Sequence, residues 1–235
     1  MANKGTPKPC KVAVIGAGAA GLVAARELDR EGHQIVVFEQ SEHVGGTWVY
    51  DPHVETDSLG LDPVRTVVHS SMYLSLRTNL PRELMGFLDY PFRVVEGRDC
   101  RRFPGHNEVA LYLQDFAAEF DLMRFIRFRT MVEYVGMGSN NQWTVRFCAD
   151  RRGIREEIYD AVVVCNGHHT QPRIAQIPED RLESGSVHAW LKRSIFLVAL
   201  WLTLDSRYYV ESMVMYQGKT TGKDTFSHKQ FSSTL

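Results

Sequence analysis

The sequence predicts an α/β fold built on a doubly wound parallel sheet, and observations close to the N-terminus support this prediction. Residues 12–15 and 35–38 are short apolar runs, typical of strands buried on both faces. A glycine turn at residues 16–21 follows the first run, and residues 22–30 then place apolar side chains on one helical face. Gly32 stands where a helix C-cap belongs. Together these segments form a Rossmann-like βαβ unit.

The pattern farther along the chain predicts further elements of the same fold. Residues 107–120 are amphipathic and predict a helix, while residues 129–135 and 142–147 resemble strands. Residues 161–165, "AVVVC", predict another buried strand. Residues 51–107 are rich in Pro, Asp and Gly, so we expect long ordered loops with short helices there.

Composition excludes several classes of function. The 235 residues are 44% apolar and 23% charged with a formal net charge of −1, so a nucleic-acid partner is not expected. The four cysteines form no CxxC pair, which indicates reduced thiols in a cytoplasmic protein. The N-terminus lacks a secretory signal, and the apolar run at residues 195–204 is about half the length of a membrane span. We expect no integral membrane segment.

The glycine turn predicts a dinucleotide site, because it satisfies the spacing G-x-G-x-x-G between a strand and a helix. The first glycine permits the tight turn, the second lets the backbone approach a pyrophosphate, and the third lets helix and strand pack closely. The helix N-terminus offers unpaired N–H groups to the phosphates. The candidate residues are Gly16, Ala17, Gly18, Ala19, Ala20 and Gly21.

Two further features distinguish among dinucleotides. Glu39 lies 18 residues after Gly21, where a carboxylate can accept both ribose hydroxyls and would repel the 2′-phosphate of NADP. This leaves FAD or NAD(H). Gly45 and Gly46, followed by Trp48, suit a chain that runs along the rest of a longer cofactor. We therefore predict FAD.

Several segments together resemble the class B flavin-containing monooxygenases, particularly the plant S-oxygenating type. The segments are "GAGAAG", "VVFEQSEHVGGTWVY", "VVHSSMYLSLRTNLPRELMGFLDYPF", "RRFPGHNEVALYLQDFA" and "DAVVVCNGHHTQPRIAQIP". The resemblance covers residues 11–178, about 70% of the chain, and "LRTNLPRELMGF" is specific to the family.

The resemblance implies a fold with one FAD-binding and one NADPH-binding domain. It also implies that NADPH reduces FAD and that the reduced flavin traps O₂ as a C4a-hydroperoxide. One oxygen atom then passes to a soft sulfur or nitrogen, so the implied substrate is a small thioether or amine. In such a protein the flavin carries the chemistry, while the chain supplies position and a dry pocket.

The resemblance also implies roles for individual residues. The glycine turn would bind the FAD pyrophosphate and Glu39 its ribose. Asn79, in "RTNLP", matches the asparagine that faces the flavin, where its amide can donate a hydrogen bond to the peroxide or hold NADP⁺. The remaining matches are Gly46, Thr47 and Trp48, which would line the cofactor, and Val132, whose backbone would meet the adenine.

The chain departs from this family beyond residue 178. No second G-x-G-x-x-G is present, because Asn141 replaces the last glycine after Gly136 and Gly138, so the site for NADPH is not found. The segment "GKTTGKD" fails as a P-loop, since three residues instead of four separate its glycines. We expect a flexible N-terminus at residues 1–10, an FAD-binding domain at residues 11–178 and a divergent, partly disordered tail at residues 179–235.

These departures leave alternatives open. The first hypothesis is a flavin-dependent monooxygenase, apparently truncated before the NADPH motif, and the second is an inactive flavin-binding remnant. A third, an NAD-binding reductase, leaves "GGTW" and "LRTNLPRELMGF" unexplained.

We predict no metal site, because His168 and His169 lack spaced partners and suit a loop. His106 is interpreted as a residue that begins a helix rather than as a base.

Overall fold

The computed structural model of the chain describes residues 8–56, 70, 72–138, 140–150, 153–167 and 214–217. The chain divides into two compact units. Unit 1 consists of Met1–Val44, Ala117–Asn166 and Glu211–Leu235, and unit 2 consists of Gly45–Phe116 and Gly167–Val210. Unit 1 is thus built from three separate stretches of sequence.

The first elements of unit 1 form the predicted βαβ unit. Strand β1 (Lys11–Ile15) leads into helix α1 (Ala19–Arg30), and strand β2 (Gln34–Phe38) returns parallel to β1. The chain leaves the helix at Gly32, which has φ +77° and donates its N–H to the Asp29 carbonyl at 2.9 Å. Glycine adopts this left-handed conformation without a steric penalty. The predicted strand–helix–strand order is confirmed, although the helix begins at Ala19 rather than at residue 22, and Gly32 directly follows the C-cap residue Glu31.

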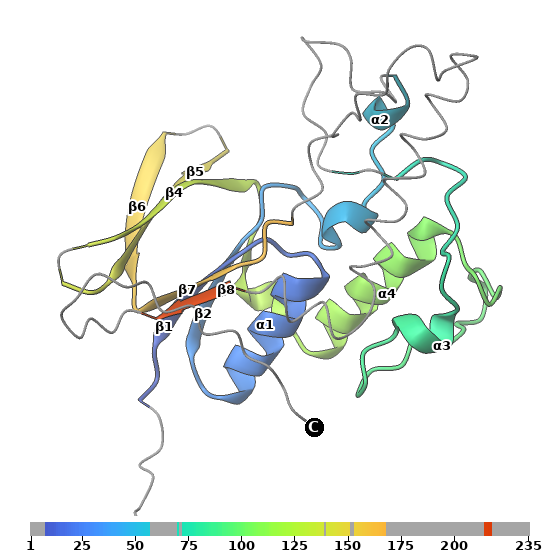
Figure 1. The fold of residues 1–235 in the computed structure, drawn as a ribbon, viewed down its shortest axis with the longest axis horizontal. Helices are drawn as coiled ribbons and strands as arrows, with labels where there is room; N and C mark the ends of the chain where they lie inside the picture. The colour runs from blue at the N-terminus through green and yellow to red at the C-terminus, as the bar shows by residue number, and fades with distance from the viewer. Residues whose placement is uncertain are drawn as a thin grey trace, which may run out of the picture. The chain divides into compact units, whose positions relative to one another are not determined.

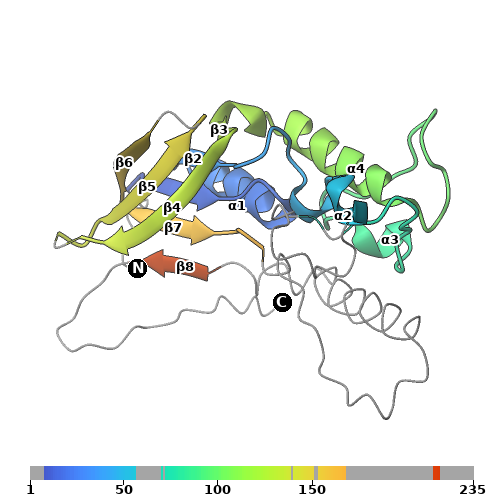
Figure 2. The same cartoon turned by 90° about the horizontal axis from the view of Figure 1, so that it is seen from above.

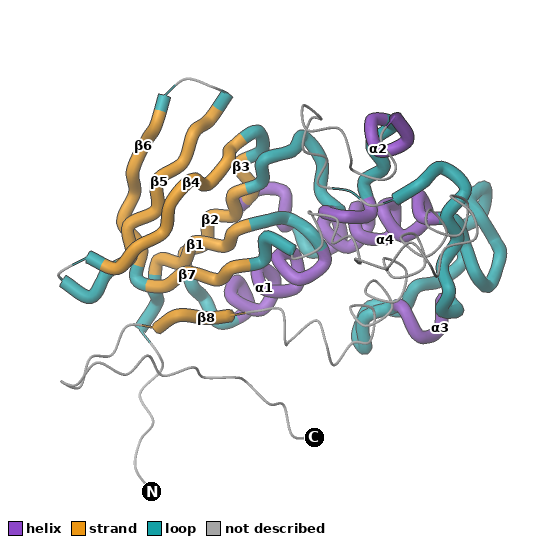
Figure 3. Tube along the Cα trace, turned by 45° about the horizontal axis from the view of Figure 1, so that its top comes forward, coloured by secondary structure: helices purple, strands orange, loops and turns teal. Residues whose placement is uncertain are grey.

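Strands from distant parts of the sequence complete the main sheet of unit 1, whose order is β3-β2-β1-β7-β8. Strand β7 (Ala161–Val164) is the predicted "AVVVC" strand and pairs parallel with β1, while β3 (Ile126–Arg127) pairs parallel with β2. The edge strand β8 (Val214–Gln217) runs antiparallel to β7. Figure 3 shows these five strands side by side. The predicted α/β fold with a parallel sheet is confirmed.

A second, antiparallel sheet lies on the face of the main sheet opposite helix α1 (Figure 1). Its strands follow one another as β4 (Thr130–Met137), β5 (Trp143–Ala149) and β6 (Ile154–Tyr159). The sequence predicts β4 and β5 with shifted ends. Strand β6 is missed, because "IREEIY" is mostly charged and exposed and lacks an apolar run.

The core of unit 1 lies between its two sheets. Phe38 of the main sheet meets Phe147 and Tyr159 of the antiparallel sheet, with ring centroids 4.9 and 6.0 Å apart. Buried aromatic rings at this spacing contribute strongly to packing. On the opposite face of β1, Val12 and Val14 are also buried. The residues of the cluster between the sheets are Ala13, Phe38, Trp143, Val145, Phe147, Tyr159 and Val162.

Unit 2 contains short helices joined by long ordered loops, as predicted for the described part of residues 51–107. Helix α3 lies beside helix α4 (Figure 2). An aromatic cluster joins α4 to the loop after α3, since the ring centroids of Phe87 and Phe116 are 4.8 Å apart and those of Phe92 and Tyr112 are 4.6 Å apart. The elements are η1 (Gly46–Trp48), α2 (His53–Thr56), α3 (Arg82–Met85) and α4 (His106–Glu119), whose end from Ala117 onward belongs to unit 1; η2 (Leu122–Phe125) follows in unit 1.

Several predictions concern residues outside the described ranges. They include the loop at His168 and His169, the apolar run at residues 195–204, the segment "GKTTGKD" and most of the tail at residues 179–235. In the ranges that the structure describes, no helix combines the length and the apolar character that crossing a bilayer requires.

Candidate functional site

The glycine turn of unit 1 has a conformation that excludes side chains at two of its positions. Gly16 has φ +101°, and a Cβ atom there would lie 2.4 Å from the Cys165 carbonyl oxygen. A Cβ atom on Gly21 would lie 1.9 Å from the Gly16 carbonyl oxygen. The Gly16 N–H donates to the Phe38 carbonyl at 2.8 Å, which fixes the turn against β2. The predicted steric roles of the first and third glycines therefore agree with the geometry.

Helix α1 begins at Ala19, within the glycine turn, and its N-terminus is suited to an anion. Gly18 is the N-cap residue, no side chain caps the helix, and its first turn carries no acidic residue. Ala19 and Ala20 follow, so no bulky side chain stands at the helix start. Exposed N–H groups and the helix dipole attract phosphate oxygens at such a position.

Glu39 is a buried carboxylate beside the turn. It is 7% exposed, and its Oε2 accepts the Ala17 N–H at 2.7 Å while Oε1 accepts the Ser41 N–H at 2.8 Å. Its own main chain is held between β3 and β4, since its N–H donates to Arg127 and its carbonyl accepts from Thr130. A carboxylate has about four acceptor positions, so hydroxyl groups of a ligand can still be bound.

Val132 lies in unit 1 as well, two residues beyond the main-chain contact between Thr130 and Glu39. It is half-buried on β4, opposite Phe147, and its side chain packs against the core between the sheets. The pairing of β4 and β5 shifts register between Val132 and Tyr134. A register shift of this kind bends a strand locally. The structure thus places the glycine turn, Glu39 and the start of β4 in one unit.

Gly46, Thr47 and Trp48 lie in unit 2 and form helix η1. Gly45 and Gly46 both have positive φ, at +128° and +55°, which explains why a glycine pair precedes the tryptophan. Trp48 is buried, and the Thr47 carbonyl accepts the Ser70 hydroxyl at 3.0 Å. This segment is therefore an ordered turn.

Asn79 also lies in unit 2, in a turn before helix α3, and its side chain is exposed. Its neighbour Thr78 is buried and donates its N–H to the Pro104 carbonyl at 2.9 Å. The Thr78 hydroxyl donates to the Leu80 carbonyl at 2.9 Å. The backbone on both sides of Asn79 is thus fixed, while its amide stays open to a ligand.

His106 begins helix α4, as predicted. Its ring is buried against Tyr50, with centroids 5.4 Å apart, and burial lowers the pKa of the imidazole. Its Nδ1 atom has no hydrogen-bond partner among the residues described. A buried neutral imidazole beside a tyrosine ring has a packing role here, consistent with its place at the helix start.

Sequence reasoning missed two residues that shape these segments. Cys165 ends the strand "AVVVC" and touches the glycine turn, and burial raises the pKa of its thiol to about 12. Arg82 is buried behind the Asn79 turn. The position of Cys165 at a strand end was a usable signal, because parallel strands end at the same edge of a sheet. No signal in the sequence indicated that Arg82 is buried.

The residues of unit 1 fit the adenosine diphosphate part of a dinucleotide. The two glycines let the turn close tightly against backbone carbonyls, the helix N-terminus has no side-chain cap, and the buried carboxylate has acceptor positions left. In the described ranges, no group of three or more His, Cys, Asp or Glu side chains could hold a metal ion.

Comparisons with known proteins give a consistent result. A family model described as "Flavin-binding monooxygenase-like" matches residues 9–183. The Arabidopsis thaliana flavin-containing monooxygenase FMO GS-OX-like 4 is 58% identical over 175 residues, which cover 71% of this chain and 39% of that protein. The Arabidopsis protein FMO GS-OX5 is 57% identical over 171 residues, 71% and 37% of the two chains. The chain thus spans about two fifths of the length of these curated relatives.

Solved structures show the same similarity. The S-allyl-L-cysteine S-oxygenase from Allium sativum is 53% identical with a TM-score of 0.70, and the match covers 74% of this chain and 40% of that one. The protein Tmm from Pelagibacter sp. strain HTCC7211 is 29% identical with a TM-score of 0.59, covering 71% and 38% of the chains. A steroid monooxygenase bound to NADP is 26% identical with a TM-score of 0.51, covering 73% and 28%.

Proposed function

Because the chain belongs to the flavin-binding monooxygenase-like family, we propose that it binds FAD through residues 11–178. We further propose that it is the FAD-binding part of a monooxygenase that uses NADPH and transfers one oxygen atom from O₂ to a small molecule. The proposed substrate is a soft sulfur or nitrogen compound, a thioether or an amine. The similarity to an S-oxygenase of Allium sativum supports the sulfur compound.

The observation that carries the proposal is the pairing of Glu39 with the glycine turn. The Ala17 N–H and the carboxylate are 2.7 Å apart, and this proximity supports a role for the carboxylate beside the first ribose of the cofactor. The buried anion would repel a 2′-phosphate, which favours FAD over NADP at this position. An NAD-binding reductase would have the same geometry, but family membership favours FAD.

In this proposal the chain positions the cofactor, and FAD supplies the redox and oxygen-activating chemistry. The backbone N–H groups at the start of α1 would hold the pyrophosphate, and Glu39 would orient the ribose. Gly46, Thr47 and Trp48 would line the cofactor, the backbone at Val132 would meet the adenine, and Asn79 would donate its amide near the reacting flavin. These roles rest on the matched motifs, and the open amide of Asn79 supports its role.

The test of cofactor binding is a titration of the purified full chain with FAD, followed by fluorescence. We expect Glu39→Ala to weaken FAD binding by about tenfold or more, because a hydrogen bond to a charged group contributes about 1.5–3 kcal/mol. Glu31→Ala is the control, since Glu31 is an exposed residue at the end of α1. Equal FAD affinity for the Glu39 variant and the control would contradict the proposal.

The test of turnover is an anaerobic titration of the FAD-loaded chain with NADPH. Loss of the flavin absorption band, followed by oxygenation of a thioether on admission of O₂, would support the monooxygenase. If dithionite bleaches the band and NADPH does not, the chain is a flavin-binding protein without turnover of its own. A colourless folded chain that binds NADH would instead support the reductase.

A further inference from the structure

Arg82 is a buried cation that lies three residues beyond Asn79. It is 4% exposed, and Glu108 of helix α4, its partner at 3.5 Å, is 3% exposed. Its guanidinium also stacks over the Phe92 ring, 4.6 Å from the centroid. Burying two charges costs more than their attraction returns in many proteins. A purely stabilising role is therefore a poor explanation of this pair.

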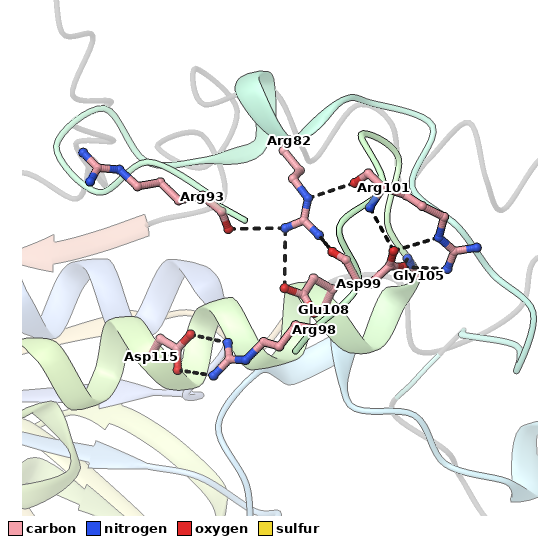
Figure 4. Close-up of polar contacts among 8 residues, drawn as sticks. All are labelled: Arg82, Arg93, Arg98, Asp99, Arg101, Gly105, Glu108 and Asp115. Atoms are coloured by element: carbon pink, nitrogen blue, oxygen red, sulfur yellow. Dashed lines mark hydrogen bonds and ion pairs between the residues drawn. The ribbon is translucent and has the colours of Figure 1, made fainter. Parts of the chain in front are cut away.

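The guanidinium donates hydrogen bonds mainly to backbone carbonyls of one loop (Figure 4). Its Nε donates to the Arg101 carbonyl at 2.9 Å, one terminal nitrogen donates to the Asp99 carbonyl, and the other reaches the Arg93 carbonyl at 3.5 Å. A guanidinium can do this because its five donors form a rigid planar fork. Arg82 thus determines the path of residues 93–101.

The same loop then continues along the Asn79 turn. The Arg82 N–H donates to the Arg102 carbonyl at 3.0 Å, and the Thr78 N–H donates to the Pro104 carbonyl at 2.9 Å. Arg77 also forms a bridge with Gly105. Asn79 therefore lies in a turn with both flanks bonded to residues 102–105, which directly follow the part held by the guanidinium.

We propose that Arg82 is a positioning residue for Asn79: its buried guanidinium fixes the loop 93–105, and this loop holds the turn that presents the Asn79 amide. The proposal concerns contacts within unit 2. It rests on the proposed function only for the consequence at the flavin. A displacement of about 1 Å can reduce the rate of an enzymatic step by about 100-fold, so such a support is chemically relevant.

Two variants separate positioning from folding. Arg82→Lys keeps the charge opposite Glu108 but replaces the fork by one compact ammonium group, which cannot reach the same carbonyls together. The double variant Arg82→Met and Glu108→Leu removes both buried charges, so it leaves no unpaired anion and favours a folded chain. Arg102→Ala is the control, because that side chain is 68% exposed and pairs with Glu83 at the surface.

The first measurement is hydrogen exchange of residues 76–82 in the full chain, followed by mass spectrometry. Both Arg82 variants should exchange about tenfold faster in this segment, because the hydrogen bonds of the Thr78 and Arg82 backbone N–H groups open locally. The second measurement is the rate at which dithionite-reduced, bound FAD is reoxidised by O₂. Both Arg82 variants should change this rate in the direction and extent of Asn79→Ala, and Arg102→Ala should match wild type in both measurements.

Affinity for FAD distinguishes this effect from general damage. It should stay within about twofold of wild type in both Arg82 variants, because Glu39 and the glycine turn keep their own contacts. Unchanged exchange of residues 76–82 in a folded Arg82 variant would overturn the proposal. If Asn79→Ala leaves the reoxidation rate unchanged, the flavin role in the proposed function fails. The exchange measurement then decides the positioning proposal alone.

Discussion

Gly16, Gly21 and Cys165 meet where the glycine turn touches the end of strand β7. The Cys165 carbonyl occupies the space of a Gly16 side chain, and the Gly16 carbonyl occupies that of a Gly21 side chain. Burial raises the pKa of Cys165, so its thiol stays neutral at pH 7 and adds no second anion beside Glu39. Each of the two glycines is thus required by a backbone atom, which cannot move aside as a side chain could.

The first prediction compares two glycines with positive φ. Gly16→Ala should destabilise the chain by about 2–4 kcal/mol and abolish FAD binding, because the methyl group meets the Cys165 carbonyl and the backbone is strained. Gly32→Ala should cost only about 1 kcal/mol, since its φ is +77° but no atom lies within 4 Å of the added group. Urea unfolding and FAD titration measure both effects. Equal FAD affinity in the two variants would contradict this account.

At the scale of elements, the antiparallel sheet β4–β6 is held to the main sheet by a core and by ion pairs from Arg127 and Lys11 to Glu157. Arg127 of β3 donates to Glu157 of β6 at 2.6 Å, and the Tyr159 hydroxyl donates to the same carboxylate at 2.6 Å. The Arg127 guanidinium lies over the ring of Phe38, which contacts Phe147. The antiparallel sheet therefore buries the face of β2 just before Glu39.

The second prediction tests this core contact. Phe147→Ala should cost about 3–5 kcal/mol, and Phe147→Leu less than about 1.5 kcal/mol, because the cavity is smaller. Ile158→Ala on the same sheet should have a small effect, since Ile158 is 42% exposed. Urea unfolding measures the free energies. A Phe147→Ala variant as stable as Ile158→Ala would show that the two sheets do not depend on each other.

The third prediction concerns the pH dependence of the loop 93–105. Hydrogen bonds from the Arg101 guanidinium, together with the Gly105 and Arg101 N–H groups, hold the pKa of Asp99 well below its usual value. A lowered folded-state pKa gives stability that is present above the unfolded value of about 3.9 and is lost as the pH falls through the folded value.

Asp99→Asn should therefore cost about 1 kcal/mol at pH 7 and make the loss of stability below about pH 4 less steep. Other carboxylates keep part of the acid dependence, because the pKa values of Glu83 and Glu157 are lowered too. Urea unfolding at pH 7 and pH 3 provides the measurement. Parallel pH profiles for the variant and wild type would refute the effect.

At the scale of the whole molecule, the sequence predicts those features of the fold and site that depend on residues close to one another along the chain. The βαβ unit has its periodicity, glycine spacing and strand-end acid within thirty residues, so its fold and the meeting of Glu39 with the turn follow from local rules. Strand β6 and the burial of Arg82 depend on distant partners that no local pattern reveals. The division into units also escapes sequence reasoning, since "GGTW" follows Glu39 closely but belongs to unit 2.

The fourth prediction concerns solubility. Leu84 and Leu88 of unit 2 are 63% and 87% exposed, and exposed apolar side chains promote association. Replacing both by Gln should increase the soluble fraction and reduce light scattering, while the unfolding free energy stays within about 0.5 kcal/mol. Leu113→Gln is the contrasting variant, because Leu113 is buried and its replacement should unfold the chain. An unchanged soluble fraction for the double variant would contradict the prediction.

The pairing of β1 with β7 has a consequence for how the protein is made. The Lys11 N–H donates to the Asp160 carboxylate at 2.8 Å across 149 residues, and β1 has β7 as its neighbour along its length. A ribosome delivers the glycine turn and β2 early, whereas the residues before β7 follow Lys11 by 149 positions, so the nascent turn lacks its β7 support until then. Nascent chains arrested before β7 emerges should fail to retain FAD, and those arrested after it should retain the cofactor.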